Sequence, residues 1–242
     1  MPMSGNIENA VSAGSSRPML EIADLTYSVG GKVLLDRARV TVSRGESVAV
    51  MGPSGSGKST LLSCILGLAK PDAGKIVVDG DDVTQLRGRR LAKYRHDKIG
   101  MVFQFGELVP ELSPLENVAL AALLAHNNRR SSYTRARKLL EELGVPETGR
   151  SDQLSGGERQ RAAVARAIIN EPGLIIADEP TGALDEETRN QVAELLVGLP
   201  RARECAMLIV THDAAVAAQA DRAVTLRQGA FTAAALPKAT VA

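Results

Sequence analysis

The 242-residue chain has few cysteines, little net charge and no long apolar run, and each of these features excludes a class of protein. Its two cysteines, Cys64 and Cys205, lack metal-ligand spacing, so we expect reduced thiols of a cytosolic protein and not disulfides or a zinc site. The formal net charge is only +1, with both signs interspersed, which argues against a nucleic-acid partner. No apolar run reaches the roughly 18 residues of a membrane-spanning helix, and no signal peptide is visible. The length indicates one domain, or one domain with an inserted lobe.

A glycine-rich loop lies between an expected strand and an expected helix. Residues 47–51 form a short apolar run, and residues 58–66 place apolar side chains at helical spacing. Glycines without a Cβ let backbone N–H groups surround a phosphate at the helix N-terminus. This context separates a nucleotide phosphate site from an ordinary glycine-rich turn. The predicted nucleotide-binding residues here are Gly52, Pro53, Ser54, Gly55, Ser56, Gly57, Lys58, Ser59 and Thr60.

Within this loop Lys58 is expected to reach the β- and γ-phosphates, where it contributes to catalysis, and the Ser59 hydroxyl to ligate Mg²⁺. A second apolar run, residues 174–177, leads directly into Asp178 and Glu179. Because ligands bind at the carboxyl ends of parallel strands, these acids are predicted to face the same nucleotide. Asp178 would hold Mg²⁺. Glu179 would act as general base on the attacking water.

One of the three histidines also follows a buried-strand pattern. His212 lies at the end of the run 207–210, one residue beyond it, whereas His96 and His126 have no motif around them and are read as packed or surface residues. Its place at a strand end favours a functional role at the same sheet edge over a packed or surface position.

The run Leu154-Ser-Gly-Gly-Glu-Arg-Gln-Arg161 resembles the signature motif of ATP-binding-cassette (ABC) ATPases. Other family elements follow in order. Tyr27 is similar to the aromatic residue that stacks on adenine, and Gln104 to the Q-loop glutamine, which contacts Mg²⁺ and takes part in hydrolysis. Asp185 is similar to the D-loop aspartate and His212 to the switch histidine, which contacts the γ-phosphate. The resemblance spans residues 19–232 and implies ATP and Mg²⁺ as cofactors.

The signature also has a physical meaning. A helix that opens at residues 155–157 presents unpaired N–H groups, a hydroxyl and the positive end of its dipole, which suit a γ-phosphate. In the family, two copies pack head to tail, so this site covers the ATP held by Lys58 of the other copy. The resemblance therefore implies a homodimer that closes on two ATP. The predicted signature contacts are Ser155, Gly156, Gly157 and Glu158.

The expected fold is α/β: a P-loop ABC-type nucleotide-binding domain over residues 18–235, with a RecA-like parallel-sheet core. Residues 20–42 alternate as two antiparallel strands around Gly30-Gly31, which predicts a small antiparallel β-lobe. An inserted helical lobe is expected over about 106–160, with helices at 115–125 and 133–143 before the signature helix. Residues 1–17 are read as a flexible tail. Beyond about residue 231 only a short tail without a further domain is expected, and the domain itself is expected to end by residue 235, before the tail 236–242.

The membrane-spanning part is absent from this chain, so a separate integral-membrane permease is expected. Residues 105–118 and 179–185 are similar to the subfamily of lipoprotein-releasing, macrolide-exporting and cell-division ATPases. That resemblance implies a four-helix permease, a hydrophobic substrate (lipoprotein, drug, antimicrobial peptide or haem) and a place on the cytoplasmic face of the inner membrane. A permease-independent ABC ATPase, such as one of cluster assembly, and a cell-division signalling ATPase remain alternatives. A small-molecule kinase would leave the signature unexplained.

Residues 104–117 carry apolar side chains in an expected loop. Such side chains would form an unexplained exposed patch unless a partner covers them. We therefore expect Gln104 to face the nucleotide, while Glu107, Leu108 and Leu112 face outward and receive a helix of the permease. The alternative is that these leucines pack under the helical lobe.

Overall fold

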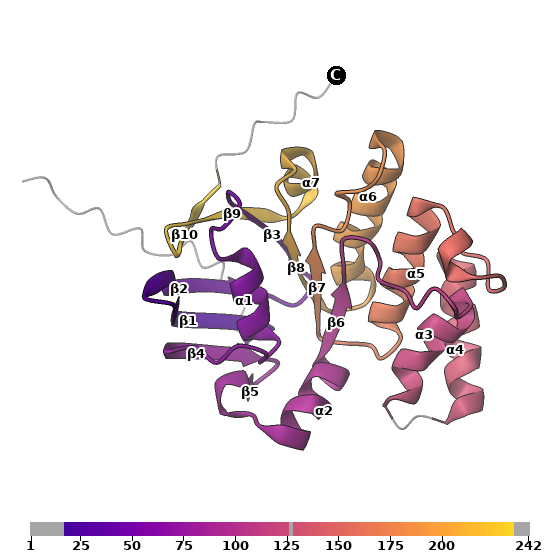
Figure 1. The fold of residues 1–242 in the computed structure, drawn as a ribbon, viewed down its shortest axis with the longest axis horizontal. Coiled ribbons are helices and arrows are strands. Elements are labelled where there is room, and N and C mark those ends of the chain that lie inside the picture. Colours follow the sequence, from indigo (N-terminus) through magenta and orange to yellow (C-terminus); the bar gives the residue numbers. More distant parts are fainter. Residues whose placement is uncertain (1–16, 126–127, 235–242) are drawn as a thin grey trace, which may run out of the picture.

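The computed structural model describes residues 17–125 and 128–234, and it has the expected mixture of a parallel and an antiparallel sheet. Figure 1 shows the β-lobe on the left, the parallel sheet in the middle and the helical lobe on the right. Among the helices of the described ranges, none combines the length and the apolar character needed to cross a bilayer. The expected tails at 1–17 and 236–242, except Arg17, lie outside the described residues, as does His126.

The β-lobe is a four-stranded antiparallel sheet in the order β2-β1-β4-β5. Its first hairpin turns at Gly30 and Gly31, both of which have positive φ, as a tight turn between two twisted strands requires. This confirms the predicted pair of strands. The strands are β1 (Leu20–Val29), β2 (Lys32–Val42), β4 (Ala73–Val78) and β5 (Asp81–Asp82).

The central sheet has the order β10-β9-β3-β8-β7-β6, and only β10 runs antiparallel to its neighbour. The expected tail beyond residue 231 is wrong in part, because β10 continues to Ala233 and pairs with β9. Strand β9 was not predicted. The strands are β3 (Ser47–Met51), β6 (Ile99–Val102), β7 (Leu174–Asp178), β8 (Ala206–Val210), β9 (Arg222–Arg227) and β10 (Ala230–Ala233).

Several strands of this sheet are apolar throughout and do not alternate between apolar and polar residues. The reason is that a hydrophobic core lies on each face of the sheet. In β8, Leu208 belongs to the core that includes the β-lobe and α1, whereas Met207 and Ile209 belong to the core that includes the helical lobe. A parallel strand that is buried on both faces has no polar side to show in its sequence.

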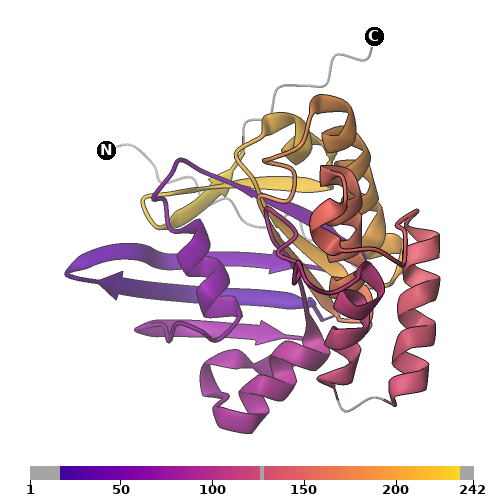
Figure 2. The ribbon, with the colours of Figure 1, turned by 45° about the vertical axis from the view of Figure 1, so that its right-hand side comes forward.

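Helices lie on both sides of the sheet, and Figure 2 shows the helical lobe standing beside its β6 edge. In that lobe α4 begins at Arg129, four residues before the predicted start, because the Asn128 side chain accepts hydrogen bonds from the first turn. Helices α2, α6 and α7 were not predicted. The helices are α1 (Lys58–Ile65), α2 (Gly88–Lys98), α3 (Pro114–Leu123), α4 (Arg129–Glu142), α5 (Gly156–Ile168), α6 (Glu186–Ala202) and α7 (Ala214–Gln219).

Candidate functional site

The glycine-rich loop connects β3 to α1 and is held tightly by neighbouring backbone. Gly52 has a φ of 152°, and a Cβ there would lie 2.5 Å from the carbonyl oxygen of Leu226. Gly57 has a φ of 102°, and its Cβ would lie 2.7 Å from the carbonyl oxygen of Leu34. Any side chain would collide with backbone at both positions, so glycine is required for the loop to curve between β2 and β9.

A cavity of about 370 Å³ opens above this loop. The Lys58 Nζ donates hydrogen bonds to the carbonyl oxygens of Gly52 (2.7 Å) and Pro53 (3.1 Å), so the ammonium lies directly over the loop. Lys32 and Leu34 of β2 line the cavity too, and the sequence analysis did not identify them, because a strand position carries no nucleotide motif. The lining is Lys32, Leu34, Ser54, Gly55, Gly57, Lys58, Ser59, Thr60, Asp178 and Glu179.

Asp178, the last residue of β7, and Glu179, which follows it, both lie in this lining. Burial raises the pKa of Asp178, and the charge of Glu179 raises it further, while the Lys58 ammonium lowers it. Glu179 has a φ of 46°, the left-handed region that non-glycine residues rarely adopt. Its N–H donates to the carbonyl oxygen of Val210 (2.8 Å), which fixes the strained turn at the sheet edge.

His212 comes from the end of β8, the strand beside β7. Its Nδ1 lies 2.9 Å from the Oε2 of Glu179, and its backbone N–H donates to the same oxygen at 3.4 Å. The imidazole is 71% exposed, whereas the Glu179 side chain is 19% exposed. The carboxylate is thus held in place while the imidazole remains open to a ligand.

Gln104 follows β6 and reaches the turn after β7. A Cβ on Gly182 would lie 2.9 Å from the Gln104 Nε2, and the Gly182 N–H donates to the carbonyl oxygen of Glu179 (3.1 Å). The glutamine amide therefore lies against the turn that carries Glu179, although it does not line the cavity itself.

Tyr27 differs from the other predicted nucleotide residues. It lies on β1 opposite Leu35 of β2, is partly buried and packs against the first core. The cavity lining contributed by the β-lobe is Lys32 and Leu34, so the structure does not place the Tyr27 ring there.

The signature segment begins α5 with a capping box. The Ser155 Oγ accepts from the Glu158 N–H (3.3 Å), and the Glu158 carboxylate accepts from the Ser155 N–H (2.9 Å) and hydroxyl (2.7 Å). These bonds lower the pKa of Glu158. Ser155 and Gly156 are exposed, and neither belongs to the lining of the Lys58 cavity of the same chain.

The glycines of the signature permit close packing against α6. A Cβ on Gly157 would lie 2.7 Å from the Cγ2 of Thr188, and one on Gly156 would lie 3.0 Å from the Cδ2 of Leu184. Asp185 caps α6, because its carboxylate accepts from the Thr188 N–H (3.0 Å). The predicted D-loop and signature are therefore in direct contact within one chain.

Helix α5 also holds the loop after β6. The Gln160 Nε2 donates to the carbonyl oxygen of Phe103 (2.9 Å). The Arg166 guanidinium donates to the carbonyl oxygens of Gly106 (2.7 Å) and Glu107 (2.6 Å). Neither residue was predicted, because both lie in the helix after the signature and their partners are backbone carbonyls. Any shift of this loop must move α5, or break these bonds.

The prediction that Leu108 and Leu112 face outward is wrong. Leu108 packs against the second core and Leu112 is partly buried, as the alternative of packing under the helical lobe expects. The apolar side chains that the loop exposes are Phe105 (59%) and Val109 (40%). Asn117 explains this arrangement, because its buried amide exchanges hydrogen bonds with the backbone N–H and carbonyl of Val109 and fixes the loop on α3.

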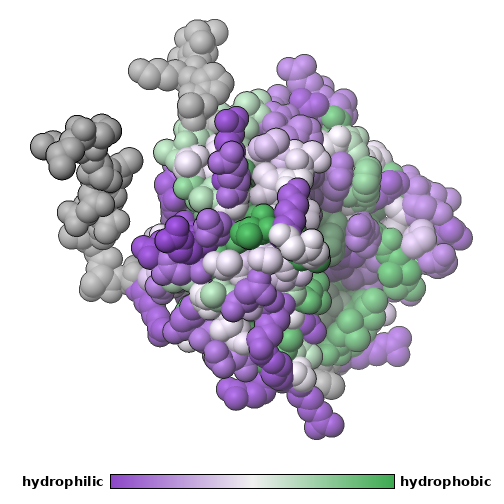
Figure 3. All heavy atoms as spheres, turned by 60° about the vertical axis from the view of Figure 1, so that its left-hand side comes forward, coloured by the Kyte–Doolittle hydropathy of each residue, from purple (hydrophilic) through white to green (hydrophobic). Residues whose placement is uncertain are grey.

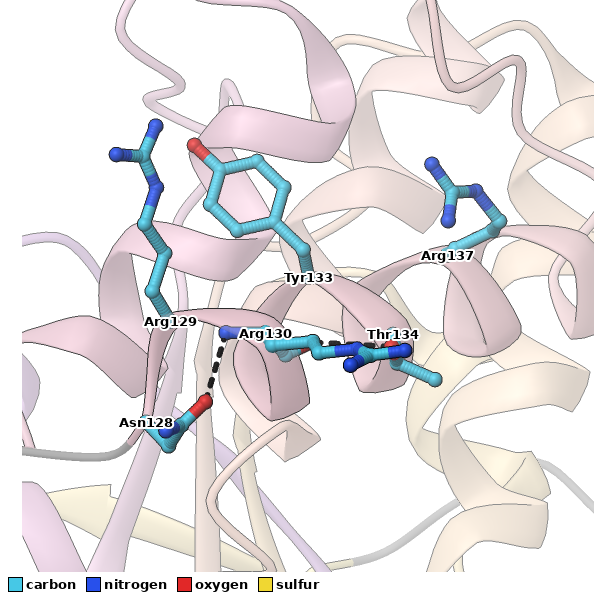
Figure 4. A pocket seen from close by; sticks show the side chains of 6 residues that line it. All are labelled: Asn128, Arg129, Arg130, Tyr133, Thr134 and Arg137. Atoms are coloured by element: carbon cyan, nitrogen blue, oxygen red, sulfur yellow. Dashed lines mark hydrogen bonds between the residues drawn. The ribbon is translucent and has the colours of Figure 1, made fainter.

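The hollow beside the start of α4 has the character of a solvated helix face. Figure 4 shows Arg129 and Tyr133 standing side by side, with the guanidinium 5.7 Å from the ring centroid. Arg137, on the same face, forms an ion pair with Glu147 at 2.6 Å. Arg129 and Arg137 thus have partners on their own helix face or beside it, as is typical of a solvated helix face.

Comparisons with known proteins found a matching family profile and similar relatives. Residues 35–182 match the sequence profile of the family described as ABC transporter. The chain is 43% identical over 198 residues to the lipoprotein-releasing system ATP-binding protein LolD of Chromohalobacter salexigens (81% of this chain, 84% of that one). It is 38% identical over 213 residues to LolD of Porphyromonas gingivalis (87% and 97%).

Two solved structures have the same fold. One is the dimeric post-hydrolysis state of the ATP-binding cassette MJ0796 bound to ADP and Pi (TM-score 0.78, 36% identity, 89% of this chain and 98% of that one). The other is cbiO1 of Clostridium perfringens, part of the ABC transporter complex cbiONQ (TM-score 0.82, 27% identity, 90% and 88%).

Proposed function

This chain belongs to the family of ABC transporter ATP-binding proteins, and we propose that it is the motor of a bacterial exporter of the lipoprotein-releasing type. It is an ATPase whose hydrolysis is coupled to transport. The proposed permease is a separate four-helix protein, and the proposed substrate is a hydrophobic molecule, with lipoproteins favoured by the names of the relatives. The chain would then act at the cytoplasmic face of the inner membrane, bound through the permease.

The observation that carries this proposal is that the chain has two separate sites suited to phosphate, the Lys58 cavity and the N-terminus of α5. The Lys58 cavity is lined by the loop, β2 and the end of β7, whereas the capped N-terminus of α5 is exposed elsewhere. An exposed helix N-terminus with a serine hydroxyl is suited to an anion that the same chain does not supply. In a head-to-tail dimer Ser155 of one copy would cover the ATP of the other, and MJ0796 is a solved dimer of the same fold.

The donor set fits a magnesium nucleotide. Ser59 and Asp178 line the cavity with oxygen atoms, and Gln104 lies beside it, which is the ligand chemistry that Mg²⁺ prefers. When bound, the ion would offset charge on the β- and γ-phosphates. Lys58 would leave its two carbonyl partners to bind phosphate.

Glu179 would accept a proton from the attacking water, and its bond to His212 would orient both groups toward the γ-phosphate. Hydrolysis would then weaken the contact that closes the dimer. Because Gln104 lies against the turn of Glu179, the loop after β6 would sense this change.

Dimer closure is tested with a chain that binds ATP but does not hydrolyse it. Glu179→Gln keeps the shape of the side chain but removes the base, so this variant should shift to dimer mass with ATP and Mg²⁺ in light scattering. Adding Ser155→Arg should keep it monomeric, because the arginine fills the phosphate contact. A Glu179→Gln chain that binds ATP yet stays monomeric at high concentration would contradict closure without the permease.

The permease contact is tested at the exposed apolar side chains of the loop. Phe105→Asp should abolish the increase in ATPase activity that membranes carrying the permease produce, because it places a charge in an apolar contact. Val29→Asp is the matched control, since Val29 is also exposed (54%) and ends β1, outside the loop; because Val29 pairs with Lys32 of the cavity, stimulation is expressed relative to the basal rate of each variant. If the permease stimulates the ATPase activity of both variants equally, this loop is not part of the interface.

The alternatives make a different prediction about the partner. A cell-division signalling ATPase would co-purify with a permease-like protein that moves no substrate, and a cluster-assembly ATPase would co-purify with none. Identification of the membrane protein retained by the chain after extraction from its own cells distinguishes the three.

A further inference from the structure

The segment that carries His212 is anchored on both sides of the histidine. On one side, the buried Thr211 donates its backbone N–H to the carbonyl oxygen of Val50 in β3 (3.1 Å), and its hydroxyl accepts from the Asp213 N–H (3.0 Å). On the other side, the Asp213 carboxylate accepts from the Ala215 N–H (2.8 Å) at the start of α7. His212 therefore lies between two anchored residues, and whatever holds Asp213 also limits where the imidazole can point.

The anchor at Asp213 depends on more than α7. Helix α7 has only six residues, and a helix of that length has little stability of its own. The Asp213 carboxylate is also bound by Arg189 of α6, whose Nη1 lies 3.4 Å from the carboxylate Oδ2. Within the described residues neither side chain has another ion-pair partner. Helix α6 has 17 residues and packs on the second core, so it supplies a fixed point for the short helix.

The ion pair between Arg189 and Asp213 is partly withdrawn from water. Hydrophilic side chains project into solvent over much of the face that Figure 3 shows. The side chains of Arg189 and Asp213, by contrast, are 33% and 25% exposed. Salt and solvent screen such a pair less than a pair on the open surface. The contact can therefore fix the position of the chain around Asp213.

Arg189 is itself held at both ends of its side chain. Its backbone N–H donates to the carbonyl oxygen of Asp185 (2.8 Å), the residue that caps α6. Its Nη2 donates to the carbonyl oxygen of Leu184 at 3.4 Å, and the Leu184 side chain packs against the second core. Both the backbone and the guanidinium are thus tied to the turn before α6, which makes Arg189 a rigid partner for Asp213.

We infer that Arg189 is a positioning residue for ATP hydrolysis, which holds His212 in place through Asp213. In that place the imidazole Nδ1 lies 2.9 Å from the Oε2 of Glu179. The imidazole is 71% exposed, so its position depends on the backbone that carries it. The inference rests on the proposed function, because it takes His212 to orient the base Glu179. It adds a residue that does not line the Lys58 cavity.

The test replaces Arg189 by methionine, which keeps the length of the side chain but removes its charge and its donors. The turnover number of Arg189→Met, measured by phosphate release at saturating ATP, should fall about fivefold, as for the loss of one partly buried ion pair. Its affinity for ATP should stay at that of the wild type, because Arg189 lies outside the cavity lining. Arg189→Lys keeps a cation beside Asp213 and should recover most of the rate.

Arg201→Met is the matched control. Arg201 lies in the last turn of the same helix and forms an ion pair with Asp221. Asp221 accepts hydrogen bonds from Ser47, at the end of β3 away from the phosphate loop. The control thus removes an ion pair of α6 that is remote from His212, and its turnover should stay at the wild-type value. If both methionine variants slow hydrolysis equally, the cause is the general stability of α6, and the inference is wrong.

Two further measurements separate positioning from a merely structural role. The chain has three histidines, so the Cε1–H signal of His212 can be assigned in NMR spectra by its loss in His212→Ala. Arg189→Met should shift that signal and leave the His96 signal in place; an unchanged His212 signal would overturn the inference. In a His212→Ala background, Arg189→Met should cause no further loss of rate in single-turnover phosphate release. A further loss of the same size would show that Arg189 acts elsewhere.

Failure of this inference and failure of the role proposed for His212 give different results. A slow His212→Ala enzyme, together with an Arg189→Met enzyme of normal rate, would remove only the positioning role of Arg189. A His212→Ala enzyme of normal rate would instead contradict the role proposed for the histidine, whatever Arg189→Met does.

Discussion

The Nδ1 of His212 lies 2.9 Å from the Oε2 of Glu179, although 33 residues separate them in the sequence. They meet because β7 and β8 are adjacent parallel strands, whose carboxyl ends share one edge of the sheet. The positive φ of Glu179 turns its chain at that edge, and the bond to His212 fixes the carboxylate. The proposed base and its proposed orienting partner are thus in direct contact beside the Lys58 cavity.

Loss of the imidazole should slow hydrolysis while leaving ATP binding intact. His212→Ala keeps the Glu179 carboxylate but frees it to rotate, so we expect the turnover number to fall by about 10²-fold or more. Glu179→Gln, measured in the same assay, should be at least as slow. The check is phosphate release at saturating ATP, together with a separate measurement of nucleotide binding. A His212→Ala enzyme with near-normal turnover would exclude the orienting role.

Lys58 and Lys32 both line the nucleotide cavity, but only one belongs to the loop. Lys58→Ala should abolish ATP turnover, because it removes the charge nearest the transferred phosphoryl group. Lys32→Ala should lower affinity only a few-fold, since an exposed cation on β2 contributes mainly long-range attraction. Titration with a fluorescent ATP analogue and steady-state phosphate release give both values. Near-normal turnover in Lys58→Ala would overturn the nucleotide assignment.

The strands and the loop chemistry could be predicted from the sequence because their signals are local. Residues 47–51 and 174–177 are short apolar runs followed at once by glycines or acids, and each is a strand of the parallel sheet. The two cores on the faces of this sheet explain why these runs show no alternation.

What the sequence did not show depends on contacts between distant elements. Lys32 and Leu34 line the cavity only because β2 packs over the phosphate loop. Arg166 serves backbone carbonyls, which have no sequence signature. Leu108 was expected outside, but the Asn117 amide draws the loop on to α3 and leaves Phe105 exposed in its place.

Two glycines in helices should respond oppositely to alanine. At Gly157 a Cβ would lie 2.7 Å from the Cγ2 of Thr188, so Gly157→Ala should lower the free energy of unfolding by about 1–3 kcal/mol through overpacking. At Gly198 of α6 nothing lies within 4 Å, so Gly198→Ala should raise it by about 0.5–1 kcal/mol. Urea unfolding of both variants checks this. An equal effect at both sites would show that the contact between α5 and α6 tolerates a methyl group.

Cys64 should make stability fall at high pH. Burial in α1, with a smaller contribution from Asp72, raises the pKa of its thiol from 9.0 to about 11. The pKa of the thiol is higher in the folded chain than in the unfolded chain. The stability contributed by the protonated thiol is therefore complete below pH 9 and is lost as the pH rises toward 11. Between pH 8 and 10.5 the loss from this one group should be about 2 kcal/mol.

Other groups titrate in the same range, so the measurement is the difference between wild type and Cys64→Ala in urea unfolding at the two pH values. Cys64→Ala has no thiol to ionise at this position. Its free energy of unfolding should therefore fall by about 2 kcal/mol less than that of the wild type between the two pH values. Equal losses, or rapid alkylation of Cys64 in the folded chain at pH 8, would show that the thiol is reached by water.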